Sequence, residues 1–188
     1  NYAAKMCLTI LRPAAVYGPD DTATLPLLKS LLAQVAIIPG EATAQFSMVH
    51  VQDVALALAD AVSNQRHGTF EIDDGSGGHS WQEISNISHA AFGVPEKVIY
   101  IPKALALALG LAGDVVGKFR GKPSLLNSGQ LRQVYHSDWR VKGQRWPLEN
   151  PIPLAKGLPE TIRWYQAKGL LPLHSSVDRK PSQQDMTG

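Results

Sequence analysis

The residues with the clearest capacity for chemistry stand close together between Asp74 and His79, in the run Asp-Gly-Ser-Gly-Gly-His. A serine beside a histidine and a carboxylate can act as a nucleophile, which would make the protein an ester hydrolase that uses Ser76. The sharp turn that exposes such a serine needs Gly-x-Ser-x-Gly, and Asp74 stands where the first glycine belongs. Triad partners also usually come from distant parts of a chain. Local turn chemistry is therefore favoured, and the hydrolase remains an alternative.

The same glycines separate an expected strand over residues 69–73 from an expected helix that opens at Ser80, as in a dinucleotide-binding loop. Ser80, however, occupies the position of the third glycine, and no acidic residue follows at the usual distance. The pattern favours a plain tight turn. Ser80 and Glu83 form a capping box for the helix, and Gly93 is expected to end it.

A second candidate site follows the mostly apolar run Leu-Thr-Ile-Leu at residues 8–11. This run predicts a strand that is buried on both faces. Pro13 ends the strand, so the next residues should lie at the carboxyl edge of a parallel sheet, where open α/β sheets bind ligands. Arg12 would then be buried and would need an anionic partner, for which Asp53 is a candidate.

The elements that must position these residues alternate between strand and helix, which predicts an α/β fold. Further strands are expected over 36–39, 46–51 and 97–101, and helices near 25–35, from Asp53 as cap to about 62, over 102–117 and over 158–168. Pro159 would lie in the first turn of the last helix, and Gly169 would follow its end.

The composition bounds the class of protein. The 188 residues are 44% hydrophobic and 18% charged, which is typical of a globular chain with one domain or two small lobes. The net charge is +2 and no basic run is interleaved with aromatic residues, so no nucleic-acid partner is expected. The most apolar run, residues 104–112, is far shorter than the roughly 20 residues that span a bilayer, so no membrane partner is expected. The single cysteine, Cys7, is interpreted as a core residue and favours a reducing, cytoplasmic compartment.

Three blocks of the sequence follow one another in a recognisable order: 12–19 (Arg-Pro-Ala-Ala-Val-Tyr-Gly-Pro), 46–55 (Phe-Ser-Met-Val-His-Val-Gln-Asp-Val-Ala) and 157–165 (Gly-Leu-Pro-Glu-Thr-Ile-Arg-Trp-Tyr). In order and spacing they resemble the C-terminal half of the extended short-chain dehydrogenases/reductases, the NAD-dependent epimerase/dehydratase family. The resemblance implies the last strands of a Rossmann-type parallel sheet plus a small mixed α/β substrate lobe. The N-terminal nucleotide-binding half of that family is absent.

The resemblance also implies domain boundaries. Residues 1–19 and 52–92 would belong to the Rossmann-like domain, residues 20–51 and 93–173 to the substrate-binding lobe, and the polar residues 174–188 to a disordered tail. A lone pair of sheet strands would expose its edge, so we expect the missing N-terminal half or a second copy of the chain to cover it. Because the sequence opens without a methionine, we expect a processed chain or part of a longer polypeptide.

By the same resemblance, the nicotinamide end of an NAD or NADP site would be lined by Pro13, Ala14 and Val16. A small-molecule substrate would be faced by Tyr17, Phe46 and Met48. The family acts through a tyrosine with a lysine four positions later, and Tyr2 and Lys5 are three apart. No catalytic residue or metal ligand is therefore assigned, and the chain alone is expected to be inactive as a dehydrogenase.

One departure from the family pattern concerns the substrate. Sugar-nucleotide members carry an arginine that clamps the diphosphate, and by register with His50 and Asp53 that position is Phe46. We therefore expect the parent protein to be an NAD(P)-dependent oxidoreductase or epimerase that acts on a weakly charged substrate and not on a UDP-sugar. A non-catalytic binding or assembly module of the same fold remains an alternative. His50 itself is expected to support packing.

Overall fold

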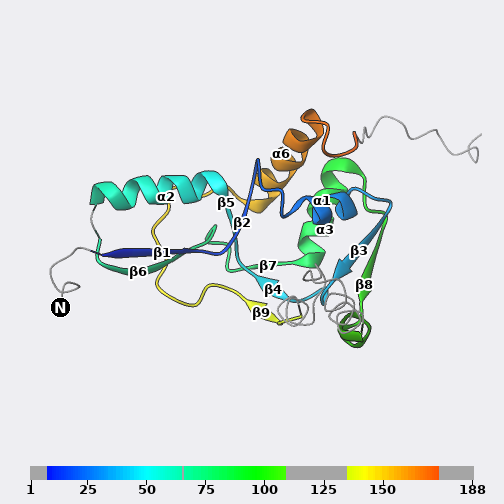
Figure 1. The fold of residues 1–188 in the computed structure, drawn as a ribbon, viewed down its shortest axis with the longest axis horizontal. Coiled ribbons are helices and arrows are strands. Elements are labelled where there is room, and N and C mark those ends of the chain that lie inside the picture. The colour runs from blue at the N-terminus through cyan, green and yellow to red at the C-terminus, as the bar shows by residue number, and fades with distance from the viewer. Residues whose placement is uncertain (1–7, 65, 109–134, 174–188) are drawn as a thin grey trace, which may run out of the picture.

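The computed structural model describes residues 8–64, 66–108 and 135–173 (Figure 1). The strands are β1 (Thr9–Pro13), β2 (Ala15–Tyr17), β3 (Val35–Pro39), β4 (Gln45–Phe46), β5 (Met48–His50), β6 (Gly68–Ile72), β7 (His79–Ser80), β8 (Lys97–Ile101) and β9 (Asp138–Trp139). The helices are α1 (Leu25–Leu31), α2 (Val51–Asn64), α3 (Trp81–Phe92) and α6 (Leu154–Ala167), and residues 103–108 are also helical. The predicted α/β fold is confirmed.

One end of the molecule is a parallel strand pair beneath a helix. β1 pairs with β6 in parallel, with Leu11 opposite Phe70, and α2 lies along one face of the pair (Figure 1). Leu11 and Phe70 pack there with Val54 and Ala57 of the helix. The other face of the pair has no such layer among the described residues, so Ile10 is 40% exposed. The prediction that this strand is buried on both faces is therefore wrong, because only one covering layer is present.

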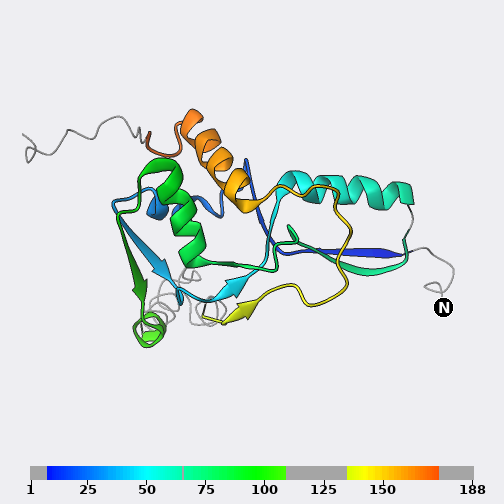
Figure 2. The same ribbon diagram turned by 180° about the vertical axis from the view of Figure 1, so that it is seen from behind.

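The outer edge of β6 is closed by residues 140–146, here named the strap. The strap runs from β9 toward α6 and passes along β6 (Figure 2). The N–H of Glu71 donates to the carbonyl of Gln144, and the N–H of Trp146 donates to the carbonyl of Glu71, both at 2.8 Å. The carboxylate of Glu71 accepts the N–H groups of Lys142 and Gly143 at 3.0 and 2.7 Å. Among the described residues, the β1–β6 pair is thus closed at β6 and open at β1.

The other end of the molecule holds the larger core. β3 and β8 pair in parallel, and their inner face packs with α1, α3 and α6. The shared cluster includes Leu31 of α1, Ile84 of α3 and Ile162 of α6. Two short sheets connect the two ends of the molecule: the parallel pair of β2 and β5, and a three-stranded sheet in which β4 lies between β7 and β9. The predicted domain boundaries remain a prediction.

The residues that begin and end α3 were predicted correctly, whereas the start of α2 and the start of α6 were not. Ser80 accepts the N–H of Glu83 at 3.1 Å, and Gly93 ends α3 in the left-handed conformation at φ +73°, as predicted. α6 begins four residues earlier than predicted, so Pro159 lies inside the helix. α2 begins at Val51, so Asp53 lies within its first turn and is not the cap.

The predicted pairing of Arg12 with Asp53 is wrong. Arg12 is exposed, and Asp53 is buried and accepts the N–H of Ile152 at 2.9 Å. The Asp53 carboxylate therefore binds the backbone that leads into α6 and does not pair with the Arg12 guanidinium. The predictions for Tyr2, Lys5 and Cys7, for most of the helix over 102–117 and for the tail over 174–188 lie outside the described residues.

Candidate functional site

The candidate site lies where β1 ends and β2 begins, beside β5. Ala14 donates its N–H to the carbonyl of Ile72 at 2.9 Å, and Ala15 donates to Ser47 at 3.3 Å. These bonds carry the chain from the β1–β6 pair onto β5, where Ala15 stands opposite Met48. The predicted cofactor residues and two of the predicted substrate residues are therefore neighbours in space, although Met48 is 33 positions from Ala15 in the sequence.

The six predicted residues differ in accessibility. Pro13 is exposed and Ala14 is half-buried, so both border the surface at the carboxyl end of β1. Val16 packs into the cluster beneath α2. Phe46 is half-buried against Trp81, with ring centroids 4.7 Å apart. Tyr17 and Met48 lie in the larger core. The roles assigned to these residues remain predictions.

Tyr17 has the most unusual environment of the group. Its side chain is 3% exposed, and its hydroxyl has no hydrogen-bond partner in the described part of the chain. The ring meets His50 edge-on at 5.3 Å and borders a cavity of about 20 Å³, roughly the space of one water. Burial, followed by the nearby Asp74, Asp53 and Glu160 carboxylates, raises the pKa of Tyr17 far above its usual value. The hydroxyl therefore stays protonated.

His50 has the surroundings of a packing residue. It is buried, and its Nδ1 accepts the N–H of Gln52 at 3.3 Å. Burial lowers the pKa of His50 despite the opposing effect of the Asp53 carboxylate. The ring is thus a neutral imidazole at neutral pH, packed against Tyr17.

The run between Asp74 and His79 forms a closed polar cluster. His79 Nε2 lies 2.6 Å from Asp74 Oδ2, and His79 Nδ1 lies 3.1 Å from Glu83 Oε1. Burial alone would lower the pKa of His79, but the bonds to Asp74 and Glu83 raise it overall. Burial alone would raise the pKa of Asp74, but the bonds from His79 and Ser76 lower it overall. The cluster therefore holds His79 between two carboxylates, both of which favour the protonated form of the ring.

This geometry argues against the hydrolase alternative. Ser76 Oγ donates to Asp74 Oδ1 at 2.7 Å, and the nearest nitrogen of His79, at 3.0 Å, is the one that faces the Asp74 carboxylate. A ring nitrogen that donates its proton to the Asp74 carboxylate cannot take the serine proton, so Ser76 is not activated. Gly75, Gly77 and Gly78 all have positive φ, which is the tight turn that the sequence favours.

Asp73 forms a second buried network that the sequence did not reveal. Its carboxylate accepts Arg145 Nε at 3.0 Å, Ser47 Oγ at 3.2 Å and the N–H of Gly75 at 3.2 Å. Ser47 Oγ in turn accepts the N–H of Val141 at 3.1 Å. Arg145 comes from the strap, 72 positions away, and Ser47 lies 26 positions away, so only the aspartate pair at the end of a strand could have pointed to a buried carboxylate.

The described residues lack a cradle for a pyrophosphate. The glycine turn nearest the site is flanked by the carboxylates of Asp73 and Asp74, which would repel a phosphate. Pro13 and Ala14 offer one wall for an aromatic ring.

A larger hollow of about 430 Å³ lies on the far flank of α2, against residues 146–149, away from these residues. In the part of the chain that the structure describes, no cluster of three or more His, Cys, Asp or Glu side chains could hold a metal ion. No helix of the described residues has both the length and the apolarity to cross a bilayer.

No family model matches the chain. A protein named ceramide reductase, from Caulobacter vibrioides, is 31% identical over 176 residues, which cover 90% of this chain and 55% of that protein. Among solved structures, dTDP-glucose 4,6-dehydratase from Bacillus anthracis in complex with NAD matches 90% of this chain and 49% of its own, with a TM-score of 0.59 and 14% identity. UDP-glucose 4-epimerase from Thermotoga maritima with UDP-glucose matches 85% and 46%, with a TM-score of 0.57 and 17% identity. The chain shares the fold of these enzymes and spans about half of the length of each relative.

Proposed function

We propose that this chain is the C-terminal portion of an extended short-chain dehydrogenase/reductase that uses NAD or NADP to oxidise or reduce a weakly charged, lipid-like substrate. The observation that carries the proposal is the 31% identity with a ceramide reductase along 90% of the chain. The likeness to the fold of NAD-dependent dehydratases and epimerases supports the coarser part of it, a nicotinamide-dependent enzyme.

The weak charge of the substrate is inferred from Phe46. The structural neighbours named above act on or bind nucleotide sugars, and the position of their diphosphate clamp holds an aromatic ring here, packed on Trp81. Trp139 of β9 pairs with Phe46 and is followed by Arg140, whose Nε and Nη2 both donate to the Asp138 carboxylate at 2.8 and 3.2 Å. A diphosphate would have to displace that carboxylate, which favours a substrate without one.

The chain supplies only one side of a cofactor site. Pro13 and Ala14 would hold one face of the nicotinamide, which supplies or accepts hydride when bound. Val16 packs beneath α2 and fixes the backbone of this segment. The described residues offer no pyrophosphate cradle, so this chain alone should bind the cofactor weakly or not at all.

We further propose that the remainder of a longer polypeptide covers the open edge of β1. α2 carries an apolar stripe, Val51, Ala55, Leu58 and Val62, whose spacing of four, three and four residues places it on one flank, and Val62 is 80% exposed. The opposite flank of α2 faces residues 146–149, on the β6 side, so the stripe lies on the β1 side. A strand paired with β1 and followed by a helix beside α2 would cover both. Because the chain spans about half of its relatives, we favour this occupant over a second copy.

The test compares the 188-residue chain with the full-length gene product. NADH or NADPH fluorescence titration should give no micromolar binding to the short chain and clear binding to the long one. The long protein should oxidise NADH or NADPH with a keto form of ceramide and should not bind UDP-glucose. Tight UDP-glucose binding, or no turnover of the keto-lipid, would overturn the substrate proposal. A folded full-length protein without cofactor affinity would point to the non-catalytic module.

A further inference from the structure

The placement of Pro13 and Ala14, here named the wall, depends on two backbone acceptors. The carbonyl of Ile72 accepts the N–H of Ala14 at 2.9 Å, and the carbonyl of Ser47 accepts the N–H of Ala15 at 3.3 Å. Ile72 ends β6 and Ser47 directly precedes β5, so these bonds fix where the chain stands as it crosses from one strand to the other.

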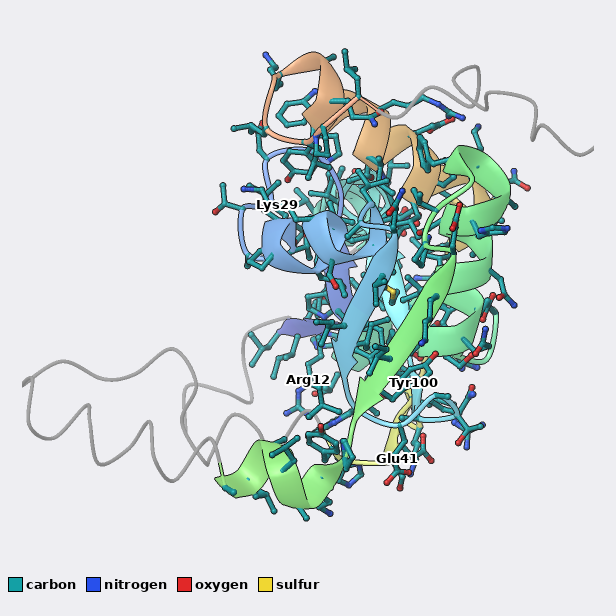
Figure 3. The ribbon with its side chains drawn as sticks, turned by 90° about the vertical axis from the view of Figure 1, so that its right-hand side faces the viewer. Arg12, Lys29, Glu41 and Tyr100 are labelled. Atoms are coloured by element: carbon teal, nitrogen blue, oxygen red, sulfur yellow. The ribbon has the colours of Figure 1, made fainter. Side chains whose placement is uncertain are left out.

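The side chains around the wall add little support. Pro13 is exposed, and Figure 3 shows Arg12, the residue before it, at the surface of the molecule. Ala14 carries only a methyl group, and Val16, two positions further, packs beneath α2. The wall therefore keeps its place through the two backbone bonds, and its position depends on what holds their acceptors.

Ser47 is the weaker of the two supports. Ile72 is fully buried at the end of β6, whereas Ser47 lies between β4 and β5 and belongs to neither strand. The N–H of Ser47 donates to the carbonyl of Trp139 at 3.3 Å, so both of its backbone bonds exceed the usual distance of roughly 2.9 Å. Its hydroxyl makes two shorter bonds: it donates to Asp73 Oδ2 at 3.2 Å and accepts the N–H of Val141 at 3.1 Å. The side chain of Ser47 therefore helps to fix the position of its carbonyl.

The carboxylate of Asp73 joins the two supports. Asp73 directly follows Ile72 in the chain, and its Oδ2 accepts the hydroxyl of Ser47. The carboxylate is held in turn, because its other oxygen accepts Arg145 Nε at 3.0 Å and the N–H of Gly75 at 3.2 Å. Its side chain is 1% exposed, so bulk water does not compete for these bonds. Asp73 thus fixes Ser47 relative to Ile72.

We propose that Asp73 is a positioning residue, which through Ser47 holds the wall in register with Met48. The inference rests on the proposed function, in which the wall contacts the nicotinamide and Met48 faces the substrate. Met48 follows Ser47 directly and lies opposite Ala15, so a shift of Ser47 moves the wall and the substrate side relative to each other. A displacement of about 1 Å can lower a rate by about a hundredfold, so a group that does not touch the reactants can control the rate.

The first test measures the wall without any cofactor. Hydrogen exchange of the Ala15 amide is followed by NMR in the 188-residue chain. Ser47→Ala removes the hydroxyl and Asp73→Asn removes one of the two acceptor oxygens, and each should speed this exchange about five- to tenfold. Both are milder than Asp73→Ala, because each leaves the buried network part of its hydrogen bonds. Ser88→Ala removes a similarly buried hydroxyl from α3, where it donates to the carbonyl of Ile84, and should leave the exchange of the Ala15 amide unchanged.

The second test uses the full-length gene product with NADH or NADPH and a keto form of ceramide. Ser47→Ala and Asp73→Asn should lower the single-turnover rate of cofactor oxidation about tenfold. The KM of the cofactor should change less than about twofold, because the wall meets only the nicotinamide ring. A purely structural role would lower thermal stability and leave the single-turnover rate of the folded enzyme unchanged. Ser88→Ala should match the wild type in both measurements.

Exchange of the Ala15 amide at the same rate in the wild type and in both variants would overturn the proposal, as would an equal change in Ser88→Ala. Faster exchange with an unchanged single-turnover rate would also overturn it. A full-length wild type that binds no cofactor would refute the proposed function, and the exchange result would still decide whether Asp73 holds the wall.

Discussion

The packing of Tyr17 against Gly157 gives a quantitative test of the core beside the candidate site. A Cβ atom built at Gly157 overlaps the Tyr17 hydroxyl oxygen and lies 3.1 Å from Ile152 Cγ2. Tyr17 is fully enclosed and cannot swing away, so we expect Gly157→Ala to cost about 3 kcal/mol in overlap. The higher helix propensity of alanine returns about 1 kcal/mol. The free energy of unfolding should therefore fall by about 2 kcal/mol.

The matched variant is Tyr17→Phe, which removes a buried hydroxyl that has no partner. We expect it to raise the free energy of unfolding by about 1 kcal/mol, because the desolvation cost of the hydroxyl disappears. In that background Gly157→Ala should be neutral or stabilising, so the two changes should couple by about 2 kcal/mol or more. Urea unfolding followed by circular dichroism measures all four corners of the cycle. A destabilising Tyr17→Phe, or an alanine effect that is the same in both backgrounds, would refute the reasoning.

Three further predictions concern the polar networks. Because the pKa of His79 is raised, its contribution to stability is complete below about pH 6.5 and is lost as the pH rises through the higher folded pKa. Because the pKa of Asp74 is lowered, its contribution to stability is complete above about pH 4 and is lost on further acidification. Urea midpoints should therefore be highest between these limits and fall as the pH rises above them, and His79→Gln should flatten the alkaline fall. A pH profile unchanged by that variant would contradict the assignment. Asp73→Ala should lower the free energy of unfolding by about 2–4 kcal/mol, because the hydroxyl of Ser47 and the N–H of Gly75 lose their acceptor, and an effect within error would show that the strap does not depend on Asp73. Ser80→Ala should cost about 1 kcal/mol and Ser80→Asp should restore it, since either oxygen can cap α3; failure of the aspartate to restore stability would exclude a capping role.

Features set by neighbouring residues were predictable from the sequence. The run Lys-Val-Ile-Tyr-Ile gave the bounds of β8, and the pair Ser80 and Glu83 gave the start of α3. The cap joins groups three positions apart, so its signal is local, and the β-forming run of β8 marks the strand even though its hydrogen-bond partner β3 lies far away in the sequence.

Features set by distant partners were not predictable in the same way. The apolar composition of β1 indicates a strand with two covered faces, but it does not say which covering layers are present. Arg12 was assigned a buried partner on that basis, and it is exposed. Asp73 acquires Arg145 only after the strap has crossed β6, so the interaction has no local signature. In the candidate site, the proximity of Tyr17 and Met48 came from family resemblance and not from their spacing.

The strap along β6 limits how this sheet can associate with others. A sheet with two open edges can accept a strand on each side and can therefore grow without end. Here Glu71 gives its N–H, its carbonyl and its carboxylate to the strap, so the β6 edge has nothing left to offer at that position. Only β1 accepts a further strand in the described pair. Two copies joined through β1 would have no free edge left in this pair, so self-association of the sheet would stop at one addition and could not grow into a fibre.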